Sequence, residues 1–443
     1  MFPKILIANR GEIAIRVIRA CKEMGISTVS VFSEADRSAL HVQLADESIC
    51  IGPSIAQKSY LNMESILSAA TTTGAQAIHP GYGLLSENAH FAQLCEKCNI
   101  KFIGPAAETI ARMGDKDAAR RTMKSAGVPV VPGSDVIESI DQLKSEAERI
   151  GFPLLIKARS GGGGRGIRRV DDMQSLEQAY YAAFGEAEVA FGDGKVYMEK
   201  LLENVKHIEV QLLCDTHGNV VTLGERECSM QRKNQKLIEE SPSPAVDETL
   251  RKKMFKAAAK AAKAVDYEGV GTVEFLLTQD KQFYFMEMNT RLQVEHPVTE
   301  MVTGIDLVKW QIRVAAGQAL PFTQSDIQLT GHAIECRINA ENPDLDFRPN
   351  CGTIGLLHVP GGPWVRFDTA LYQGYVIPPF YDSMIAKLIV HAPTRTEAIR
   401  KMRAALCEMV IEGVDHTGFM QIDLMSEPWF EDGSYTTSAL AGR

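Results

Sequence analysis

The sequence has no excess of basic residues, no long apolar run, and no repeated or low-complexity segment. Its formal net charge is −9, which argues against a general nucleic-acid-binding protein, because such proteins neutralise phosphates with a surplus of Lys and Arg. No uninterrupted apolar run approaches the roughly 20 residues that a membrane-spanning helix needs. The chain also starts without the apolar core and cleavage site of a secretory signal peptide. We therefore expect no nucleic-acid partner, no membrane span, and a cytoplasmic location, or an organelle matrix if the source is eukaryotic.

Cysteine is present but not patterned. The nine cysteines stand singly except for Cys95 and Cys98, which fall in a helical pattern with no second pair or histidine to complete a zinc site. The sequence therefore predicts structural helix cysteines in a reducing compartment.

The composition is that of an ordinary globular protein, with 45% hydrophobic and 23% charged residues in a chain of 443. Such a chain is long enough for several domains with their own cores. Near the N-terminus, short apolar runs at 4–8, 27–32 and 77–79 alternate with helical segments at 12–24 and 59–73. This alternation predicts an α/β domain over residues 1–114, with a Rossmann-like parallel sheet covered on both faces.

The rest of the chain predicts α+β structure. Strand-like segments at 153–157 and 167–170 precede a helix at 174–184 and a strand at 196–200. Two further strand-like segments, 271–277 and 282–289, are joined by a short turn and predict an antiparallel hairpin. A helix is also predicted at 116–125, before these strands. The part from about residue 331 begins with a strand at 333–338 and ends in helices at 395–408 and 421–427. We expect domains at 1–114, 115–330 and 331–443.

Four consecutive glycines, Gly161–Gly164, lie between two of the predicted strands. A dinucleotide-binding loop would open a helix here, and a P-loop would end in Lys-Ser or Lys-Thr, but neither follows. A glycine-rich hairpin tip offers exposed backbone N–H groups and room for a ligand. With Lys157 and Arg165 beside it, the loop predicts a mobile flap over nucleotide phosphates; the alternative is a merely flexible surface loop.

Polar side chains occupy every second position through residues 286–296. On a strand these side chains share one face; they are Glu287, Asn289, Arg291, Gln293 and Glu295. The predicted hairpin would also bring Glu274 near Glu287. Two carboxylates and an amide oxygen are ligands that suit magnesium beside nucleotide phosphates. The alternative is a solvent-facing strand with cross-strand ion pairs.

Together these segments resemble the ATP-grasp superfamily, and most closely the biotin carboxylases. The resemblance runs nearly end to end through seven motifs: Ile7–Ala14, His79–Gly83, Leu85–Asn88, Met113–Lys116, Cys228–Gln231, Glu287–Glu300 and Tyr381–Ile385. It implies an ATP-grasp fold with the N-terminal Rossmann-like domain, a mobile glycine-rich lid at about 131–204, and a C-terminal biotin carboxylase domain.

The resemblance implies an ATP-dependent ligase that forms a C–N bond. Such an enzyme uses Mg²⁺, with Mn²⁺ as the alternative metal, and phosphorylates bicarbonate to carboxyphosphate, whose breakdown carboxylates biotin. This is the first half-reaction of an acyl-CoA carboxylase, as in malonyl-CoA formation for fatty acid synthesis. The chain has no biotin attachment sequence, since Thr122–Lys124 lies on a predicted helix. The implied partners are therefore a separate biotin carboxyl carrier protein, carboxyltransferase subunits, and a second copy of the chain, with Arg19 and Glu23 at the dimer interface.

The resemblance also assigns residues to roles. The implied catalytic residues are Glu295 as the base that deprotonates bicarbonate, with Arg291, Lys236 and Arg337. The bicarbonate pocket comprises Lys236, Arg291, Gln293 and the Val294 backbone, biotin contacts Tyr82 and Arg337, and the metal ligands are Glu274, Glu287 and Asn289. The implied ATP-binding residues are Lys116, Lys157, Gly163, Gly164, Glu199, Lys200, Leu202, His207, Gln231, Asn234 and Leu276.

Several positions depart from the family pattern. Asn234 stands where histidine is expected near the nucleotide, Leu201 replaces an aromatic residue, and Pro363 replaces an aromatic residue at the dimer interface. Arg159 and Ser160 precede the glycines where a small residue and glycine are usual. Three alternatives stay open: a degraded paralogue that binds nucleotide or partners without turnover, the carboxylase subunit of a pyruvate or propionyl-CoA carboxylase, and another ATP-grasp ligase such as a carboxylate–amine ligase.

Overall fold

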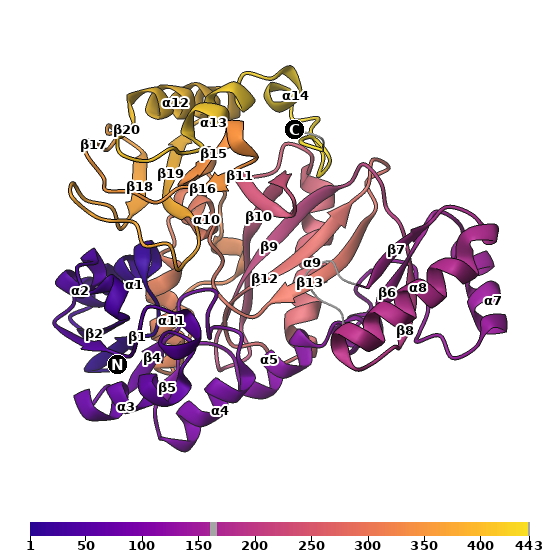
Figure 1. Cartoon of the computed structure of the whole chain (residues 1–443), viewed down its shortest axis with the longest axis horizontal. Coiled ribbons are helices and arrows are strands. Elements are labelled where there is room, and N and C mark those ends of the chain that lie inside the picture. Colours follow the sequence, from indigo (N-terminus) through magenta and orange to yellow (C-terminus); the bar gives the residue numbers. More distant parts are fainter. Residues whose placement is uncertain (160–165, 442–443) are drawn as a thin grey trace. The chain divides into compact units, whose positions relative to one another are not determined.

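The structure is a computed structural model that describes residues 1–159 and 166–441 (Figure 1). The chain divides into two compact units. The first comprises Met1–Gly114, Lys206–Glu274 and Met288–Arg443, and the second comprises Asp115–Val205 and Phe275–Glu287. Among the described residues, no helix combines the length and apolar character needed to cross a membrane.

The first unit begins with a five-stranded sheet in the order β3-β2-β1-β4-β5. All four strand pairs are parallel. The strands are β1 (Lys4–Ile7), β2 (Ser27–Phe32), β3 (Glu47–Cys50), β4 (Ala77–His79) and β5 (Lys101–Phe102), and the helices are α1 (Gly11–Glu23), α2 (Leu40–Leu44), α3 (Met63–Thr73), α4 (Ala89–Lys97) and α5 (Ala107–Gly114). Ile5 and Ile7 belong to one buried cluster and Leu6 to another. Because successive side chains of a strand point to opposite faces, the sheet is covered on both sides, and the predicted parallel sheet is confirmed.

The cysteine prediction is confirmed for Cys95, which lies on α4 and is buried, while Cys98 directly follows that helix. All nine cysteines lie in described residues and are free thiols.

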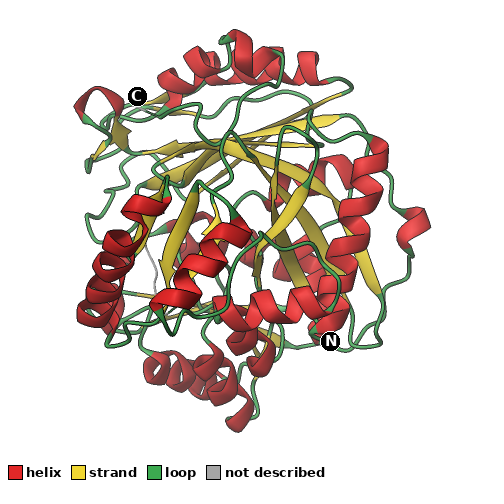
Figure 2. Ribbon diagram, turned by 90° about the vertical axis from the view of Figure 1, so that its right-hand side faces the viewer, coloured by secondary structure: helices red, strands yellow, loops and turns green. Residues whose placement is uncertain are grey.

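A second sheet has eight strands in the order β13-β12-β9-β10-β11-β14-β19-β18; its strands are among those drawn in yellow in Figure 2. They are β9 (Lys206–Cys214), β10 (Val220–Arg232), β11 (Gln235–Ser241), β12 (Gly269–Leu277), β13 (Phe283–Asn289), β14 (His332–Asn339), β18 (Val365–Thr369) and β19 (Met384–Ala392). The pairs from β9 to β18 are antiparallel. The remaining helices of the first unit are α9 (Glu248–Ala264), α10 (His296–Thr303), α11 (Leu307–Ala315), α12 (Arg395–Glu408), α13 (Gly418–Leu424) and α14 (Pro428–Glu431).

Helix α13 differs from the helix predicted at 421–427, since it begins at Gly418 and ends at Leu424. Its start is fixed to β14, because Thr417 exchanges hydrogen bonds with the backbone of Asn339. Its end is set by Pro428, which disfavours helical backbone at the preceding Glu427.

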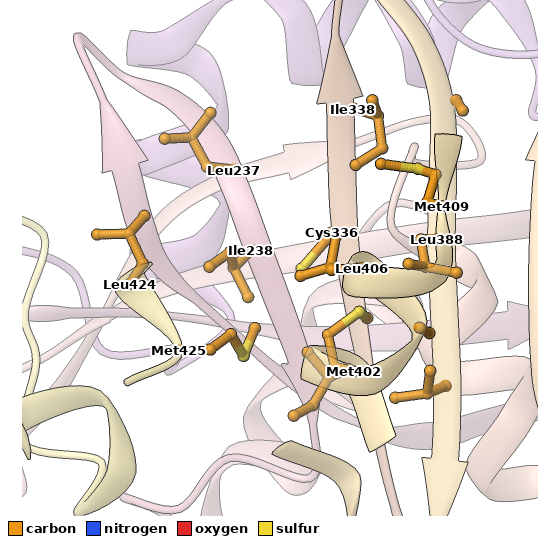
Figure 3. Close-up of a cluster of buried hydrophobic side chains, with 14 of the residues drawn as sticks. Leu237, Ile238, Cys336, Ile338, Leu388, Met402, Leu406, Met409, Leu424 and Met425 are labelled. Atoms are coloured by element: carbon orange, nitrogen blue, oxygen red, sulfur yellow. The ribbon is translucent and has the colours of Figure 1, made fainter. Parts of the chain in front are cut away.

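The buried cluster in Figure 3 holds the C-terminal part of this sheet against α12. Its side chains come from β11, β14, β19, α12 and the segment around α13; those labelled are Leu237, Ile238, Cys336, Ile338, Leu388, Met402, Leu406, Met409, Leu424 and Met425. Each fully buried aliphatic side chain stabilises the fold by about 1.5–3 kcal/mol relative to leaving it exposed. Glu335 and Arg337 on β14 and Lys387 on β19 alternate with residues of this cluster and therefore point to the opposite face of the sheet.

The strand predicted to run through residues 286–296 is shorter than expected. Strand β13 ends at Asn289, and α10 begins at His296 with Pro297 in its first turn. The backbone N–H of Thr290 donates to the Glu87 carboxylate instead of to a neighbouring strand. Residues 290–295 therefore form a loop, and the inference that one strand face collects the polar residues is wrong beyond Asn289.

Among its described residues, the second unit contains a three-stranded antiparallel sheet in the order β7-β6-β8, three helices, and the parts of β12 and β13 that lie in Phe275–Glu287. The strands are β6 (Leu154–Ala158), β7 (Ile167–Val170) and β8 (Val196–Lys200), and the helices are α6 (Lys116–Ser125), α7 (Ile140–Ile150) and α8 (Met173–Phe191). The two strands predicted on either side of the glycine loop are confirmed as β6 and β7. The loop itself, with Gly163 and Gly164, lies outside the described residues.

Glu240 on β11 ties the C-terminal segment to the large sheet of the first unit. The carboxylate accepts hydrogen bonds from His332 at 2.6 Å and Arg395 at 2.7 Å, and from the Tyr435 hydroxyl. Burial would raise the pKa of Glu240, but the hydrogen bonds and charges of His332 and Arg395 lower it from 4.5 to about 2.

We expect Glu240→Gln to lower the free energy of unfolding by roughly 3 kcal/mol at neutral pH. The unfolded chain protonates this carboxyl near its ordinary pKa, whereas the folded chain keeps it ionised, so its stabilisation is present above about pH 4.5 and is lost as the pH falls toward 2. Denaturant unfolding at pH 7 and pH 4 measures both values. The difference in the free energy of unfolding between wild type and Glu240→Gln should be smaller at pH 4 than at pH 7. Exposed Glu248 provides the control, since Glu248→Gln should change the free energy of unfolding little. A gap that does not depend on pH would contradict the assignment.

Candidate active site

Lys236, on β11 of the first unit, is surrounded by buried carboxylates. Its ammonium nitrogen lies 2.7 Å from Glu295 Oε1 and 3.3 Å from Glu274 Oε1, and it also contacts Glu209. Burial alone would lower the pKa of Lys236, but these three carboxylates raise it well above its ordinary value. The side chain is therefore a fixed positive charge that an anionic ligand can share.

Glu295 lies between two cations. It directly precedes α10 and is 2% exposed, with its second oxygen 2.9 Å from Arg337 Nη2. Burial would raise the pKa of Glu295, but the charges of Lys236, Arg337 and Arg226 lower it well below its ordinary value. The carboxylate is ionised without a ligand, and an anion that binds to the same cations would raise its pKa toward that of a useful base.

Arg337 is held in place from several sides. Its Nε donates to Glu239 at 2.6 Å, and its backbone carbonyl accepts a hydrogen bond from Gln421. Carboxylates of Glu239, Glu295 and Glu335 keep the guanidinium charged in spite of its burial. Its charge also acts on the phenol of Tyr82, whose hydroxyl donates to Glu12. The two residues predicted to contact biotin are thus both in the first unit and close enough to interact electrostatically.

Glu274, on β12, is hydrogen-bonded to a predicted metal ligand, Asn289, and to a predicted bicarbonate contact, Gln293. Its carboxylate accepts from Asn289 Nδ2 at 2.8 Å and Gln293 Nε2 at 2.7 Å, and lies 2.8 Å from His207 Nε2. Although burial opposes ionisation, Lys236 and His207 lower the pKa of Glu274 well below its usual range. A carboxylate beside an amide is a donor set that fits Mg²⁺.

Arg291 completes this group from the loop after β13. Its Nη2 donates to Asn289 Oδ1 at 3.1 Å and its Nε to Glu87 at 2.8 Å. The loop therefore brings together the residues that a continuous strand was predicted to align. Glu287 belongs to the second unit, so its proximity to Glu274 stays a prediction.

Of the predicted ATP-binding residues in the first unit, Gln231 donates to His207 Nδ1 at 3.2 Å. Asn234 is exposed in the turn that joins β10 to β11.

In the second unit, Lys157 is paired with Glu199, and Lys200 donates to the carbonyls of Gly151 and Phe152. Lys116 is exposed at the start of α6. Leu202 follows β8, Leu276 lies on β12, and the joint role of these residues in binding ATP stays a prediction.

Glu209 and Arg226, which were not predicted from the sequence, are fully buried at the base of this cluster. Burial and the charge of Glu295 raise the pKa of Glu209 to about 7. Arg226 donates to Glu209 at 2.9 Å and to Gln293 Oε1 at 2.6 Å. For Glu209 the available signal was the alternation of His207, Glu209 and Gln211 with apolar residues on β9, which has the same period as the pattern around Glu295.

Comparisons with known proteins agree with this geometry. Three family models match: Biotin carboxylase, N-terminal domain over residues 1–110, Carbamoyl-phosphate synthase L chain, ATP binding domain over residues 115–323, and Biotin carboxylase C-terminal domain over residues 335–442. Biotin carboxylase 1 of Bacillus subtilis (strain 168) is 55% identical over 99% of this chain and 98% of its own length.

Two solved structures have a similar fold. The biotin carboxylase from Campylobacter jejuni, a complex described as β-γ-ATP, is 51% identical, covers 100% of this chain and 99% of its own, and has a TM-score of 0.95. The biotin carboxylase domain dimer of the Hydrogenobacter thermophilus 2-oxoglutarate carboxylase, in complex with MgADP, ADP and bicarbonate, is 51% identical over 99% of this chain and 97% of its own, with a TM-score of 0.92. Full-length identity above half, an ATP-grasp fold and matching domain models in the same order leave one assignment: the chain belongs to the biotin carboxylase family.

Proposed function

We propose that the protein carboxylates biotin with bicarbonate in an ATP- and Mg²⁺-dependent reaction, and that the biotin arrives on a separate carrier protein. The observation that carries this proposal is the placement of ionised Glu295 between Lys236 and Arg337, at 2.7 and 2.9 Å. Such a group can bind a small anion and remove a proton from it. The bicarbonate complex of the similar Hydrogenobacter domain supports the choice of anion.

In this proposal, bicarbonate displaces part of the carboxylate–cation network. Lys236 and Arg291 neutralise the anion, and the Gln293 amide orients it. Glu295 accepts its proton, which makes the oxygen a better nucleophile toward the γ-phosphate of ATP. Arg337 then stabilises the negative charge that develops on the biotin ureido oxygen, because a guanidinium is a permanent cation with directed donors.

The proposed Mg²⁺ ligands are Glu274, Asn289 and Glu287. When bound, the metal shields the phosphate charges that bicarbonate must approach. We propose that ATP contacts His207, Gln231 and Asn234 in the first unit. In the second unit the proposed contacts are Lys116, Lys157, Gly163, Gly164, Glu199, Lys200, Leu202 and Leu276.

The domain division at 1–114, 115–330 and 331–443 is part of the proposal, as are a homodimer and a carboxyltransferase partner. Arg19 and Glu23 are exposed on α1, and Glu23 pairs with Lys309 of the same chain. A cytoplasmic or organelle-matrix location fits the bacterial source of the similar Bacillus protein.

Asn234 offers a test of the nucleotide contact. Lys233 and Asn234 have φ of 48° and 64°, a turn in which Asn and His are both tolerated. We expect Asn234→His to lower the KM for ATP several-fold with turnover unchanged, because an added ring contact and hydrogen bond are worth roughly 0.5–1.5 kcal/mol, up to about tenfold. Steady-state ATP titrations measure the change, and Asn234→Ala should raise the KM. If both variants keep the wild-type KM, Asn234 does not contact ATP.

The reaction itself is tested by ATP hydrolysis with and without bicarbonate and free biotin. We expect hydrolysis to require bicarbonate and to rise with biotin. Hydrolysis that responds to neither would favour a degraded paralogue, and hydrolysis that instead needs an amine and another carboxylate would favour a different ATP-grasp ligase.

A further inference from the structure

Lys387 is a fully buried lysine that the proposed reaction does not use. It lies on β19, where the register places it beside Arg337 of β14 on one side and Asp368 of β18 on the other. Its side chain is 0% exposed. Lys387 is the one charged residue in the segment Met-Ile-Ala-Lys-Leu-Ile-Val, from Met384 to Val390. A leucine at this position could be buried without the cost of desolvating a charge, so the presence of lysine needs a physical reason.

Its ammonium group connects two segments that are far apart in the sequence. It donates to the backbone carbonyl of Val294 at 2.8 Å and lies 3.1 Å from Glu12 Oε1. That same Glu12 oxygen accepts the hydrogen bond from the Tyr82 hydroxyl. The Tyr82 ring lies beside the ammonium, with its centroid 5.8 Å away. One cation therefore contacts the peptide directly before Glu295 and, through Glu12, the phenol of Tyr82.

The surroundings keep this group charged. Burial disfavours the ammonium form, but the carboxylates of Glu12, Glu335 and Asp368 outweigh it and raise the pKa of Lys387 above its ordinary value. Neither carboxylate oxygen of Glu335 has a hydrogen-bond partner among the described residues. Lys387 therefore donates no hydrogen bond to Glu335, and its ammonium group is directed toward Val294 and Glu12. Buried ion pairs seldom add net stability compared with apolar packing, which favours a role in geometry over one in folding.

We propose that Lys387 is a positioning residue that holds the bicarbonate segment at Val294–Glu295 and the biotin contact Tyr82 at a fixed separation. This inference rests on the proposed function, because it uses those two pockets. Transfer of a carboxyl group between the pockets needs reacting atoms about 3–3.5 Å apart. Because Lys387 contacts Val294 and, through Glu12, Tyr82, it would control the distance between the two pockets without touching either substrate.

Lys387→Met removes the charge, the hydrogen bond to Val294 and the ion pair with Glu12 while keeping a long side chain. We expect the KM for bicarbonate and the KM for biotin to rise about tenfold or more, since displacement of a reacting group by about 1 Å can cost a hundredfold in rate. The dissociation constant of ATP, measured by equilibrium dialysis, should stay within about twofold of wild type. We also expect more ATP to be hydrolysed per biotin carboxylated, because the two halves of the reaction lose their alignment.

The double variant Lys387→Met with Glu12→Gln separates geometry from folding. Glu12 is left buried without its cation in the single variant, so removing that charge should restore the thermal unfolding temperature. The bicarbonate KM should stay high, because the tie to Val294 is still missing. The positioning role is wrong if the double variant recovers both the unfolding temperature and the bicarbonate KM. It is also wrong if Lys387→Met alone keeps the wild-type KM for bicarbonate and for biotin.

Lys206→Met is the matched control. Lys206 is also a largely buried lysine, and it donates to the carbonyls of Gly433 and Tyr435 in the C-terminal segment. This variant should lose stability with unchanged KM values. Glu295→Gln, measured in parallel, tests the proposed site itself. Full activity of Glu295→Gln would overturn the site assignment. Loss of activity in Glu295→Gln together with wild-type KM values in Lys387→Met would overturn only the positioning role.

Discussion

Replacing Glu295 with Gln is expected to reduce bicarbonate-dependent turnover by a hundredfold or more, the range typical of a lost general base. The amide keeps the size of the side chain and can still accept a hydrogen bond from Arg337, 2.9 Å away in the wild type. It cannot take a proton from bicarbonate. ATP binding should stay near wild type, because the Glu295 carboxylate accepts its hydrogen bonds from Lys236 and Arg337, and neither is a proposed ATP contact. Single-turnover phosphate release and ATP binding by equilibrium dialysis measure the two quantities.

Glu239 supplies the control for this experiment, since it is a buried carboxylate on the same guanidinium, 2.6 Å from Arg337 Nε. Glu239→Gln changes the charge around Arg337 equally but removes no proposed base. We expect its turnover to fall by less than about tenfold, the cost of weakening one hydrogen bond to a charged group. Equal losses in the two variants would show that Glu295 acts through Arg337 and not as the base.

Arg226→Met is expected to have the largest effect on stability, about 3–5 kcal/mol, because it leaves the buried Glu209 without one of its two cationic partners, the other being Lys236. Arg226 is completely buried and donates to Glu209, Thr299 and Gln293. The variant should also raise the KM for bicarbonate, since the Gln293 amide loses its fixed orientation. Denaturant unfolding and bicarbonate titrations measure the two effects.

Arg251→Met is the matched control for Arg226. Arg251 binds Glu225, another fully buried carboxylate, at 2.7 Å, but the pair lies on α9 and β10 away from Lys236. Its loss should lower stability without a change in the bicarbonate KM. If both variants raise that KM alike, the effect comes from general destabilisation and the proposed role of Arg226 in orienting Gln293 is wrong.

The residues around Glu295 could be found from the sequence, although the reason was partly incorrect. Alternation marked Asn289, Arg291, Gln293 and Glu295 as candidates, yet the strand ends at Asn289. The residues converge because a loop wraps around Glu274, where hydrogen bonds from Asn289 and Gln293 meet. A period of two in polar residues cannot distinguish a strand from such a loop, because in both cases the functional side chains occupy every second position of the sequence.

Arg226 and Lys387 could not be assigned from the sequence for a different reason. Each is a buried basic residue on a strand, and its role depends on partners that are distant in the chain. Lys387 and Val294 are 93 positions apart, and Arg226 and Gln293 are 67 apart. Such contacts are fixed by the strand order of the large sheet, in which β11 is followed by β14 and β19. Local periodicity gives the strands but not that order.

Transfer of label from ¹⁴C-bicarbonate to free biotin measures directly whether the protein carboxylates biotin. We expect acid-labile carboxybiotin that forms only with ATP and Mg²⁺, accumulates in proportion to the biotin-dependent part of phosphate release, and forms at least a hundredfold more slowly with Glu295→Gln. Phosphate release without labelled biotin, or labelled biotin at the wild-type rate in the Glu295→Gln protein, would contradict this expectation.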